Sequence, residues 1–460
     1  MAVSADSHGI RKFVETRFLL GRPLTTELTA ILLVYFVQGI LGLARLAVSF
    51  FLKDDLALSP AEVAALTGIA SLPWTVKPLF GFLSDGLPIG GYRRRPYLVI
   101  SGLMGTAAWL VLATSVQTAW LATAMILMSS VSVAISDVIV DSLVVERARQ
   151  ESQSEAGTIQ SLCWGASAIG GILTAYLGGL LLEYTSTRMV FGVTATFPLV
   201  VTVVAWLIAE EATTEKSSVG VVWSQVKQLK AAFSQKAIWM PALFLFLWQS
   251  TPSADSAFFF FTTNDLGFKA EFLGRVQLVT SLAALLGIGI FQRFLKAVSF
   301  RVIFAWSTVL AALGGLTTLL LVTHANRSLG IEDHWFSLGD SAILTIMGQI
   351  AFMPVLVLSA RLCPPGVEAT LFALLMSIVN MASLVSRELG ALLTHWLHVT
   401  ETDFTNLWLL VVITNLTTLL PLPLLFLLPK DSVSTSVDQI GGTAPVITAD
   451  PESPEPALSS

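Results

Sequence analysis

Long apolar stretches recur along almost the whole of this 460-residue chain, and they decide what it can fold into. A helix rises 1.5 Å per residue, so about 20 apolar residues cross a bilayer core of about 30 Å. With 54% of its residues apolar and 12% charged, the composition is that of a polytopic membrane protein. The sequence predicts an all-α fold with twelve membrane-spanning helices, at Thr29 to Phe51, Pro60 to Leu83, Tyr97 to Ser115, Trp120 to Val144, Ala156 to Leu182, Met189 to Ala209, Ala237 to Phe261, Leu273 to Leu295, Val302 to Thr323, Ala342 to Leu362, Val367 to Trp396 and Leu407 to Leu428.

The basic residues indicate which side of the membrane each loop faces. With the N-terminus inside, 18 of the 26 Lys and Arg residues are cytoplasmic, 5 are external and 3 lie deep in spans. Loops on the cytoplasmic side carry such an excess of basic residues. We therefore expect a multi-pass protein of the cell membrane, embedded in the lipid bilayer as a monomer, with both termini in the cytoplasm.

The spans divide into two sets of six on either side of the longest internal loop. That loop, residues 210–236, is polar at its start and contains a stretch that suits an amphipathic interfacial helix. The predicted organisation is a cytoplasmic segment at 1–28, a six-helix half at 29–209, the cytoplasmic linker at 210–236, a second six-helix half at 237–429 and a disordered cytoplasmic tail at 430–460. The tail is rich in Ser, Thr, Pro and acids, and too poor in apolar residues to offset the entropy of ordering.

Several classes of protein are excluded by composition. The net charge of −5 and the lack of any basic tract beyond Arg93 to Arg95 exclude a nucleic-acid footprint. Cys163 and Cys363 have neither disulfide nor metal-ligand spacing, and the five histidines are scattered. No glycine loop ending in Lys-Ser or Lys-Thr is present, so the chain lacks the nucleotide site of an ATP-driven pump. We expect no enzymatic activity, no cofactor and no metal site.

The loop between the second and third spans carries a recognisable motif. Gly81 is followed four residues later by Asp85, and then by Arg93, Arg94 and Arg95. This pattern, together with twelve spans in two halves, resembles the major facilitator architecture, in which two halves rock about a site at the membrane midplane. The chain departs from the common form of the motif, because Leu-Pro-Ile-Gly-Gly lengthens the turn before the arginines.

Four longer strings narrow the resemblance. They are LPWTVKPLFGFLSDGLPIGGYRRRPYL, SDVIVDSLVVERAR, PSADSAFFFFTTNDLGF and CPPGVEATLFALLMSIVN, and they run in order through both halves. Together they resemble the folate-biopterin transporter family of the major facilitator superfamily. The resemblance implies a secondary transporter of folates or other pterins that works by alternating access. The short N-terminal segment favours a bacterial inner-membrane protein, such as a cyanobacterial one, over a plastid precursor. By this resemblance Gly81, Asp85 and the three arginines, with Glu146 and Arg149 opposite, form a cytoplasmic gate. The alternative is that the basic loop only fixes orientation.

Charged side chains inside the spans are the candidates for the transport site, because an ionisable group at bilayer depth costs about 2.5 kcal/mol or more. Arg45 shares a helix face with Gln38, and it either faces a cavity or extends to the outer surface. Lys77, between Trp74 and Pro78, either lines a cavity or extends inward.

Asp137 and Asp141 lie one helical turn apart on the fourth span. Asp141 belongs either to this site or to a cytoplasmic network with Glu146, Arg147 and Arg149. Burial and the like charge of Asp141 both disfavour the charged form of Asp137, so we expect this pair to carry a proton during transport. Further substrate-binding candidates are Gln249 and Asp255 beside the proline-broken middle of span 7, Arg387 on one face with Asn380, and the uncharged Gln160, Trp164 and Gln349. For Arg387 the alternative is neutralisation by Glu388 near the outer interface.

Two other functions fit the same residues. Acidic groups facing an apolar, aromatic cavity suit proton-coupled efflux of amphipathic compounds, and Phe258 to Phe261 form a run of four aromatic residues. A transport-inactive membrane assembly factor would retain the same fold.

Overall fold

The computed structural model describes residues 23–148, 158–210, 234–295, 298–361 and 368–428, together with residues 19, 212, 227 and 230. Within these ranges the regular secondary structure is helical, and the β pairing is an isolated bridge between Ile89 and Tyr92. The all-α fold is therefore confirmed. The predicted segments at 1–18, most of 211–233 and 429–460 lie outside the described residues, as do Arg149 and Cys363.

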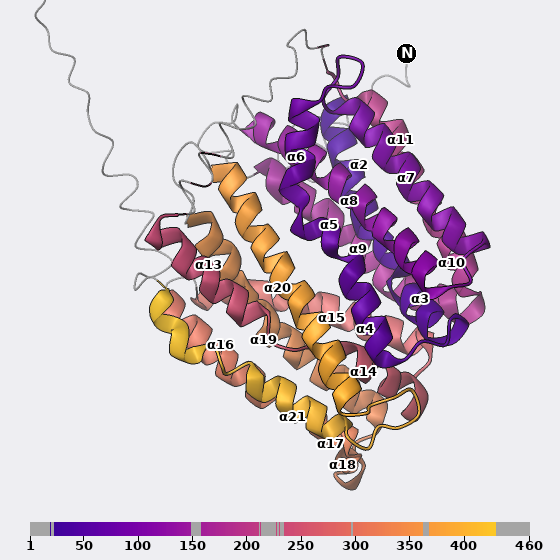
Figure 1. Ribbon diagram of the computed structural model, residues 1–460, viewed down its shortest axis with the longest axis vertical. Coiled ribbons are helices and arrows are strands. Elements are labelled where there is room, and N and C mark those ends of the chain that lie inside the picture. The colour runs from indigo at the N-terminus through magenta and orange to yellow at the C-terminus, as the bar shows by residue number, and fades with distance from the viewer. Residues whose placement is uncertain are drawn as a thin grey trace, which may run out of the picture.

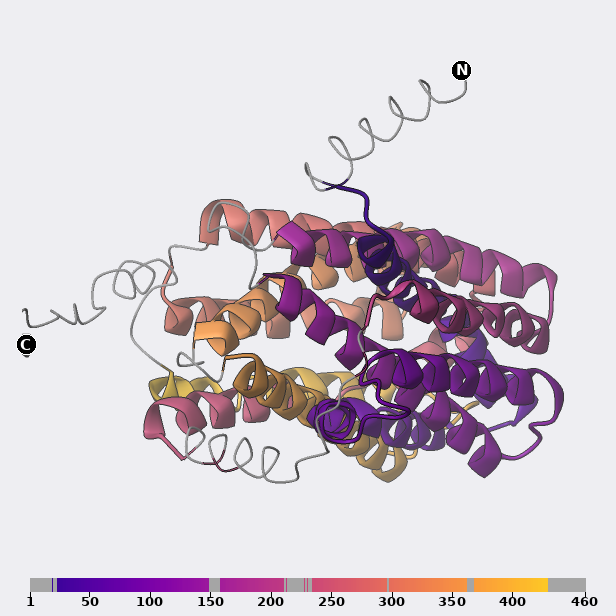
Figure 2. The ribbon, with the colours of Figure 1, turned by 90° about the horizontal axis from the view of Figure 1, so that it is seen from above.

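Helices α2 to η3 come from the first part of the chain and those from α13 to η6 from the second, and Figures 1 and 2 show the two groups gathered on different sides of the molecule. The first group comprises α2 (Thr26–Ile40), η1 (Leu41–Leu43), α3 (Ala44–Phe50), η2 (Phe51–Asp55), α4 (Pro60–Ala70), α5 (Leu72–Thr75), α6 (Lys77–Gly86), α7 (Arg95–Thr114), α8 (Ala119–Ala148), α9 (Thr158–Tyr184), α10 (Thr187–Thr194), α11 (Thr196–Val204) and η3 (Ala205–Leu207). The second comprises α13 (Lys236–Gln249), α14 (Asp255–Phe260), η4 (Phe261–Asp265), α15 (Ala270–Ile290), η5 (Phe291–Leu295), α16 (Phe300–Gly315), α17 (Thr318–Val322), α18 (Ala325–Ser328), α19 (Asp333–Arg361), α20 (Glu368–Trp396), α21 (Leu407–Thr417) and η6 (Leu422–Leu427).

Ten helical stretches of the described chain are long and apolar enough to cross a membrane, and they match ten of the twelve predicted spans. The other two predicted spans are interrupted. The span expected from Pro60 to Leu83 is divided into α4, α5 and α6, and the one from Ala237 to Phe261 is divided into α13 and α14. Prolines lie at or beside these interruptions, and a proline removes a helical hydrogen bond. The interruption of the seventh span agrees with the proline-broken middle predicted there, whereas the division of the second span was not predicted.

The ends of the first and seventh predicted spans have the same backbone structure. In both, a π-helical turn begins at a phenylalanine, and a leucine amide donates to that phenylalanine carbonyl: Leu56 to Phe51 at 3.0 Å, and Leu266 to Phe261 at 3.1 Å. A residue with positive φ follows in each case, Ala57 at 51° and Gly267 at 67°. The first and seventh predicted spans therefore end in the same backbone conformation; the division into two halves stays a prediction.

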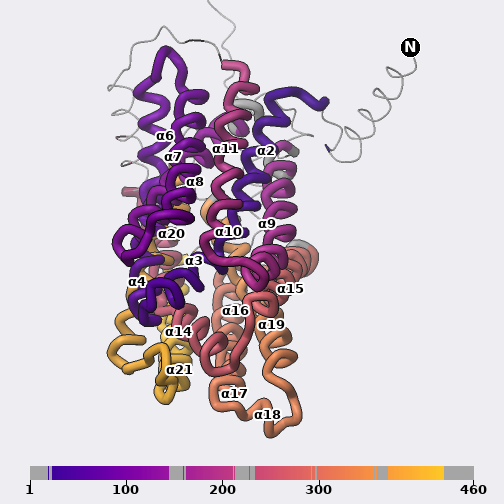
Figure 3. The backbone as a smooth tube through the Cα atoms, turned by 90° about the vertical axis from the view of Figure 1, so that its right-hand side faces the viewer, coloured from indigo at the N-terminus to yellow at the C-terminus, as the bar shows by residue number. Residues whose placement is uncertain are grey.

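The two groups of helices contact each other at the end of the bundle that holds these turns, where α17 and α18 also lie (Figure 3). A Cβ atom added to Gly179 of α9 would be 2.3 Å from the carbonyl oxygen of Ala270 and 2.7 Å from Cα of Gly274, both in α15. Lys53 Nζ donates to Asn264 Oδ1 at 2.7 Å, and the rings of Phe50 and Phe259 meet edge to face at 5.3 Å. We call this set of contacts the closed end.

Candidate functional site

A cluster of charged side chains connects α6 and α8 within the first group of helices. The Lys77 ammonium forms ion pairs with Asp137 and with Asp141, the latter at 2.9 Å, and the Tyr35 hydroxyl of α2 donates to Asp141. The Trp74 ring lies 5.9 Å from Lys77 Nζ and presents its face to the charge. We call Tyr35, Lys77, Asp137 and Asp141 the lysine cluster.

The interruption between α5 and α6 positions the lysine. Pro73 lies in the first turn of α5 and Pro78 in the first turn of α6, where a missing backbone N–H costs nothing. Val76, between the two helices, has φ −105° and ψ 13°, outside the helical region. Lys77 is consequently the first residue of α6, and its side chain reaches α8, where two aspartates one turn apart receive it.

The charges of the lysine cluster do not balance. One ammonium faces two carboxylates, so the cluster carries a net charge of −1 when both aspartates are ionised. The side chains of Lys77 and Asp137 are only 21% and 13% exposed, and an excess charge at this depth is costly. Binding of one proton makes the cluster neutral.

The contacts of the lysine cluster distinguish between the alternatives that the sequence left open for Lys77 and Asp141. Lys77 reaches toward α8 instead of extending to the membrane surface. Asp141 joins the lysine cluster through Lys77 and Tyr35. The side chain of Glu146, its other expected partner, is not among the described ones. Gln38 lies beside Asp137 and lines a small crevice between α2, α7, α8 and α11.

A cavity of about 490 Å³ lies within the second group of helices. Two predicted site residues, Gln249 and Asp255, line it on either side of the interruption between α13 and α14. Its other polar lining groups include Asp340, whose carboxylate accepts hydrogen bonds from Thr317 at 2.5 Å and Thr318 at 3.0 Å. The cavity is lined by Trp248, Gln249, Thr251, Pro252, Ser253, Ala254, Asp255, Phe258, Thr308, Ala311, Gly315, Thr318, Asp340, Ser341, Leu344, Ser386, Val411, Thr414, Asn415 and Thr418.

Two arginines predicted for the site, Arg45 in α3 and Arg387 in α20, both have exposed side chains. Neither forms an ion pair or a hydrogen bond through its side chain with the residues that the structure describes. Asn380, on the same helix as Arg387, donates to the Trp74 carbonyl at 3.1 Å and so links α20 to α5.

The uncharged candidates are spread over several surfaces. Trp164 is 62% exposed on α9, and Gln349 packs its Cβ against Gly287 where α19 meets α15. The side chain of Gln160 is not among the described ones. The structure therefore does not bring Trp164 or Gln349 together with the lysine cluster.

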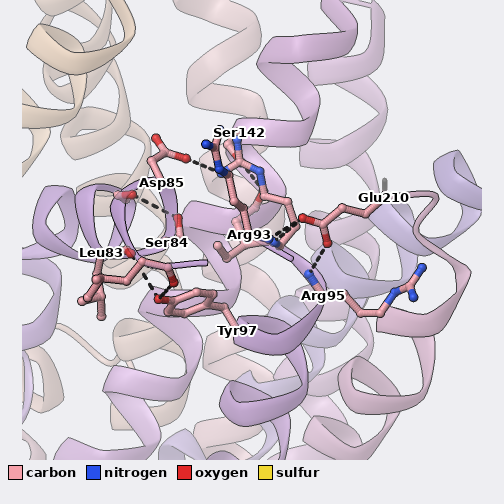
Figure 4. A network of polar contacts seen from close by, with 12 residues as sticks. Leu83, Ser84, Asp85, Arg93, Arg95, Tyr97, Ser142 and Glu210 are labelled. Carbon is pink, nitrogen blue, oxygen red and sulfur yellow. Dashed lines mark hydrogen bonds and ion pairs between the residues drawn. The ribbon is translucent and has the colours of Figure 1, made fainter. Parts of the chain in front are cut away.

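The predicted gate loop forms a compact network (Figure 4). Gly90 and Gly91, with φ of 61° and 86°, make the two-residue turn of a short hairpin, a conformation that glycine adopts readily. The hairpin brings Arg94 back to Asp85, where Nη1 and Oδ1 are 2.8 Å apart. Gly81 lies against Val138 of α8. The lengthened turn is therefore compatible with the ion pair that the motif predicts.

A second acidic residue holds this loop. The carboxylate of Glu210 accepts hydrogen bonds from the backbone amides of Arg93, Arg94 and Arg95 at 2.5, 2.8 and 2.9 Å. These amides lie at the start of α7, where backbone donors have no helical partner. The loop between the second and third spans is thereby tied to the end of the sixth, as Figure 4 shows.

Sequence reasoning missed three of these residues. Tyr35 lies three residues before Gln38 on the face that the sequence pattern already marked, so that signal was available. Asp340 was assigned to a loop because the tenth span was expected to begin at Ala342, whereas α19 begins at Asp333. Glu210 reaches its partners only through tertiary structure, and no local pattern indicates it.

Comparison with known proteins yields both sequence and structural relatives. The profile of the BT1 family matches residues 38–445. The folate-biopterin transporter of Synechocystis sp. is 61% identical over 420 residues, which cover 91% of this chain and 85% of that protein. Probable folate-biopterin transporter 2 of Arabidopsis thaliana is 35% identical, with 86% and 81% covered, and folate transporter 2 of Plasmodium falciparum is 29% identical, with 89% and 92% covered.

Two solved structures show the fold. The nucleoside transporter NupG matches with a TM-score of 0.64 at 15% identity, covering 87% of this chain and 98% of its own. A D-xylose-proton symporter matches with a TM-score of 0.63 at 13% identity, covering 88% and 98%. The fold is that of the major facilitator transporters.

Proposed function

Because this chain belongs to the BT1 family, we propose that it is a secondary transporter that moves folates and related pterins across the membrane. The observation that carries the proposal is the 61% identity to a folate-biopterin transporter over 91% of the chain. The fold supplies two groups of helices that close against each other at one end, as alternating access requires.

Protons are the proposed energy source. The lysine cluster provides one site where a proton is bound and released, because its two carboxylates share one ammonium. A conformational change that moves Lys77 away from α8 leaves two adjacent carboxylates, which favours proton uptake. The return of Lys77 favours proton release.

The cavity within the second group is the proposed site for the pterin ring. Its volume of about 490 Å³ is in the range of small-molecule sites. The Trp248 and Phe258 side chains offer aromatic surface, and the Asp255 carboxylate matches the donor-rich 2-amino edge of a pterin. Catalysis is not part of this function, and the protein is proposed to act as a monomer in the cell membrane with both termini in the cytoplasm.

Uptake by reconstituted vesicles tests the proposal. Vesicles that contain the purified protein should accumulate labelled folate above empty vesicles when a proton gradient is imposed, and unlabelled biopterin should compete. Folate uptake equal to that of empty vesicles under inward and outward gradients would exclude the function. Competition by a lipophilic cation but not by biopterin would instead favour efflux of amphipathic compounds.

A further inference from the structure

Helix α20 contacts the lysine cluster of the first group of helices as well as the cavity of the second. Asn380, near the middle of α20, donates from Nδ2 to the carbonyl of Trp74 in α5 at 3.1 Å. The Trp74 ring in turn presents its face to the Lys77 ammonium at 5.9 Å. The Asn380 side chain therefore reaches, through Trp74 alone, the lysine that pairs with the two aspartates.

The Trp74 carbonyl depends on a donor from another helix. In a continuous helix it would accept from the residue four positions later, but that residue is Pro78, which has no N–H. Asn380 supplies a donor at this interruption, which is the one that sets the direction of Lys77. A side chain of the second group thus holds the backbone of the first group at the point where Lys77 takes its position.

The same helix contacts the cavity about one turn further along. Ser383, three residues after Asn380, accepts a hydrogen bond from Nε2 of Gln249 at 3.3 Å, and Gln249 lines the cavity. Ser386, which also lines the cavity, donates to the Thr251 carbonyl at 2.5 Å. Helix α20 is therefore bonded to the interruption of the seventh span at the cavity and to the interruption of the second span at the lysine cluster.

This arrangement gives Asn380 a role other than substrate contact, since it is not among the described residues that line the cavity. Resting on the proposed function, we propose that Asn380 is a positioning residue that couples folate binding in the cavity to proton binding by the lysine cluster. The bond from Gln249 to Ser383 is longer than the usual N–H···O range of about 2.7–3.2 Å, so a ligand in the cavity can take over the Gln249 amide.

The two events are linked through the position of α20. When the ligand takes the Gln249 amide, α20 loses a bond to the seventh span and shifts relative to α5. The Trp74 carbonyl then loses its donor, and the released interruption lets Lys77 move away from the aspartates. A proton from solvent neutralises one of the two carboxylates that are left side by side. Because coupling between two binding sites is reciprocal, folate should bind more tightly to the protein whose lysine cluster is protonated.

Folate dissociation constants measured on the purified full-length protein test this coupling. From about pH 8 to about pH 5, a range in which ordinary carboxylates stay ionised, the wild-type constant should fall by about 5- to 150-fold. Asn380→Leu has a similar size but no donor, so it should bind folate with a constant that changes by less than about twofold over this range. Ser377→Ala is the control and should behave as the wild type, because the Ser377 hydroxyl donates to the Ala373 carbonyl of its own helix at 2.9 Å. Any titration of folate itself is common to all of these proteins.

Two further variants separate the hydrogen bond from packing and from poor folding of Asn380→Leu. Asn380→Gln keeps an amide donor on a longer side chain, so it should retain part of the pH dependence. Ser383→Ala removes the contact with Gln249 at the other end of the path and should lose the pH dependence. A pH indicator in weak buffer should show proton uptake when folate is added to the wild type or Asn380→Gln, and none for Asn380→Leu or Ser383→Ala.

Different outcomes would overturn different parts of the proposal. Wild-type pH dependence in Asn380→Leu or in Ser383→Ala, or equal losses in Asn380→Leu and Asn380→Gln, would overturn the positioning role. Loss of folate binding by Asn380→Leu and Asn380→Gln at every pH would make Asn380 a substrate ligand instead. A wild type that binds folate equally well at every pH would overturn the coupling and leave folate as the substrate, whereas one that binds neither folate nor biopterin would overturn the proposed function.

Discussion

At the scale of single residues, the distinctive feature is one ammonium shared between two carboxylates. The sequence marked Asp137, Asp141 and Lys77 separately, because each is an ionisable residue in an apolar stretch. Their convergence depends on the interruption at Val76, which sets the direction of the lysine. The sequence therefore showed which residues are charged and how deep they lie, whereas their ion pairing could be seen only in the backbone geometry.

The proposed coupling role of Asp137 makes a specific prediction. Asp137→Asn keeps shape and hydrogen bonding but cannot take up a proton, so proton-driven accumulation of folate in vesicles should be abolished. Exchange of labelled for unlabelled folate, which needs no net proton movement, should stay measurable.

The control for this experiment is Glu332→Gln, which removes an exposed carboxylate just before α19. It should accumulate folate as the wild type does. Wild-type accumulation by Asp137→Asn would contradict the coupling role, and loss of exchange as well would make Asp137 a substrate ligand.

At the scale of elements, turns and helix contacts explain most of what the sequence pattern left open. Apolar length located ten spans and the prolines of span 7 indicated its broken middle, but the division of the second span was revealed only by the structure. The repeated turn after the first and seventh spans offers two positions with the same backbone and different residues, Ala57 and Gly267.

Exchanging alanine and glycine at these two positions should change the stability of the protein in opposite directions. A non-glycine residue with positive φ is strained by about 1–2 kcal/mol. Glycine relieves this strain in the folded protein, but its greater conformational freedom in the unfolded chain offsets part of the gain in stability. Ala57→Gly should therefore stabilise the protein by about 0.5–1 kcal/mol, and Gly267→Ala should destabilise it by about the same amount. A Cβ at Gly267 would meet nothing within 4 Å, so backbone strain alone is tested. Thermal unfolding of both variants checks this, and shifts in the same direction would disprove it.

Stability should also depend on the close contact between α9 and α15. Gly179→Ala places a methyl group against the backbone of α15, and overpacking of this kind costs about 1–3 kcal/mol. Gly165→Ala, on the same helix but with open space around it, is the matched control. The unfolding temperature should fall for Gly179→Ala alone. Equal behaviour of the two variants would show that the contact adds nothing to stability.

At the scale of the whole molecule, the apolar lengths in the sequence predicted the fold class correctly, while the orientation indicated by the basic residues stays a prediction. The candidate site was predicted less completely. Gln249 and Asp255 share a cavity as the broken middle of span 7 suggested, but Trp164 and Gln349 lie elsewhere. The rotation and tilt of each helix decide which side chains face the same cavity. When most faces of a helix are apolar, the periodicity of a single sequence does not reveal that rotation.

Orientation can be tested by labelling. Gly330 lies in an exposed loop between α18 and α19, at the end of the bundle opposite α6 (Figure 3). An epitope inserted there should be labelled in intact cells, whereas one at the N-terminus should be labelled only after permeabilisation, because basic residues stay inside. Labelling of the N-terminal epitope in intact cells would reverse the assigned orientation.

The repeated turn also shows how few side chains this backbone conformation requires. Phe51, Asp55 and Leu56 recur as Phe261, Asp265 and Leu266 around the same π-helical turn, while the three residues between each Phe and Asp differ. The two ends of the turn and the leucine that closes it are thus the shared positions. Substitutions at the three positions between them should therefore leave the turn intact.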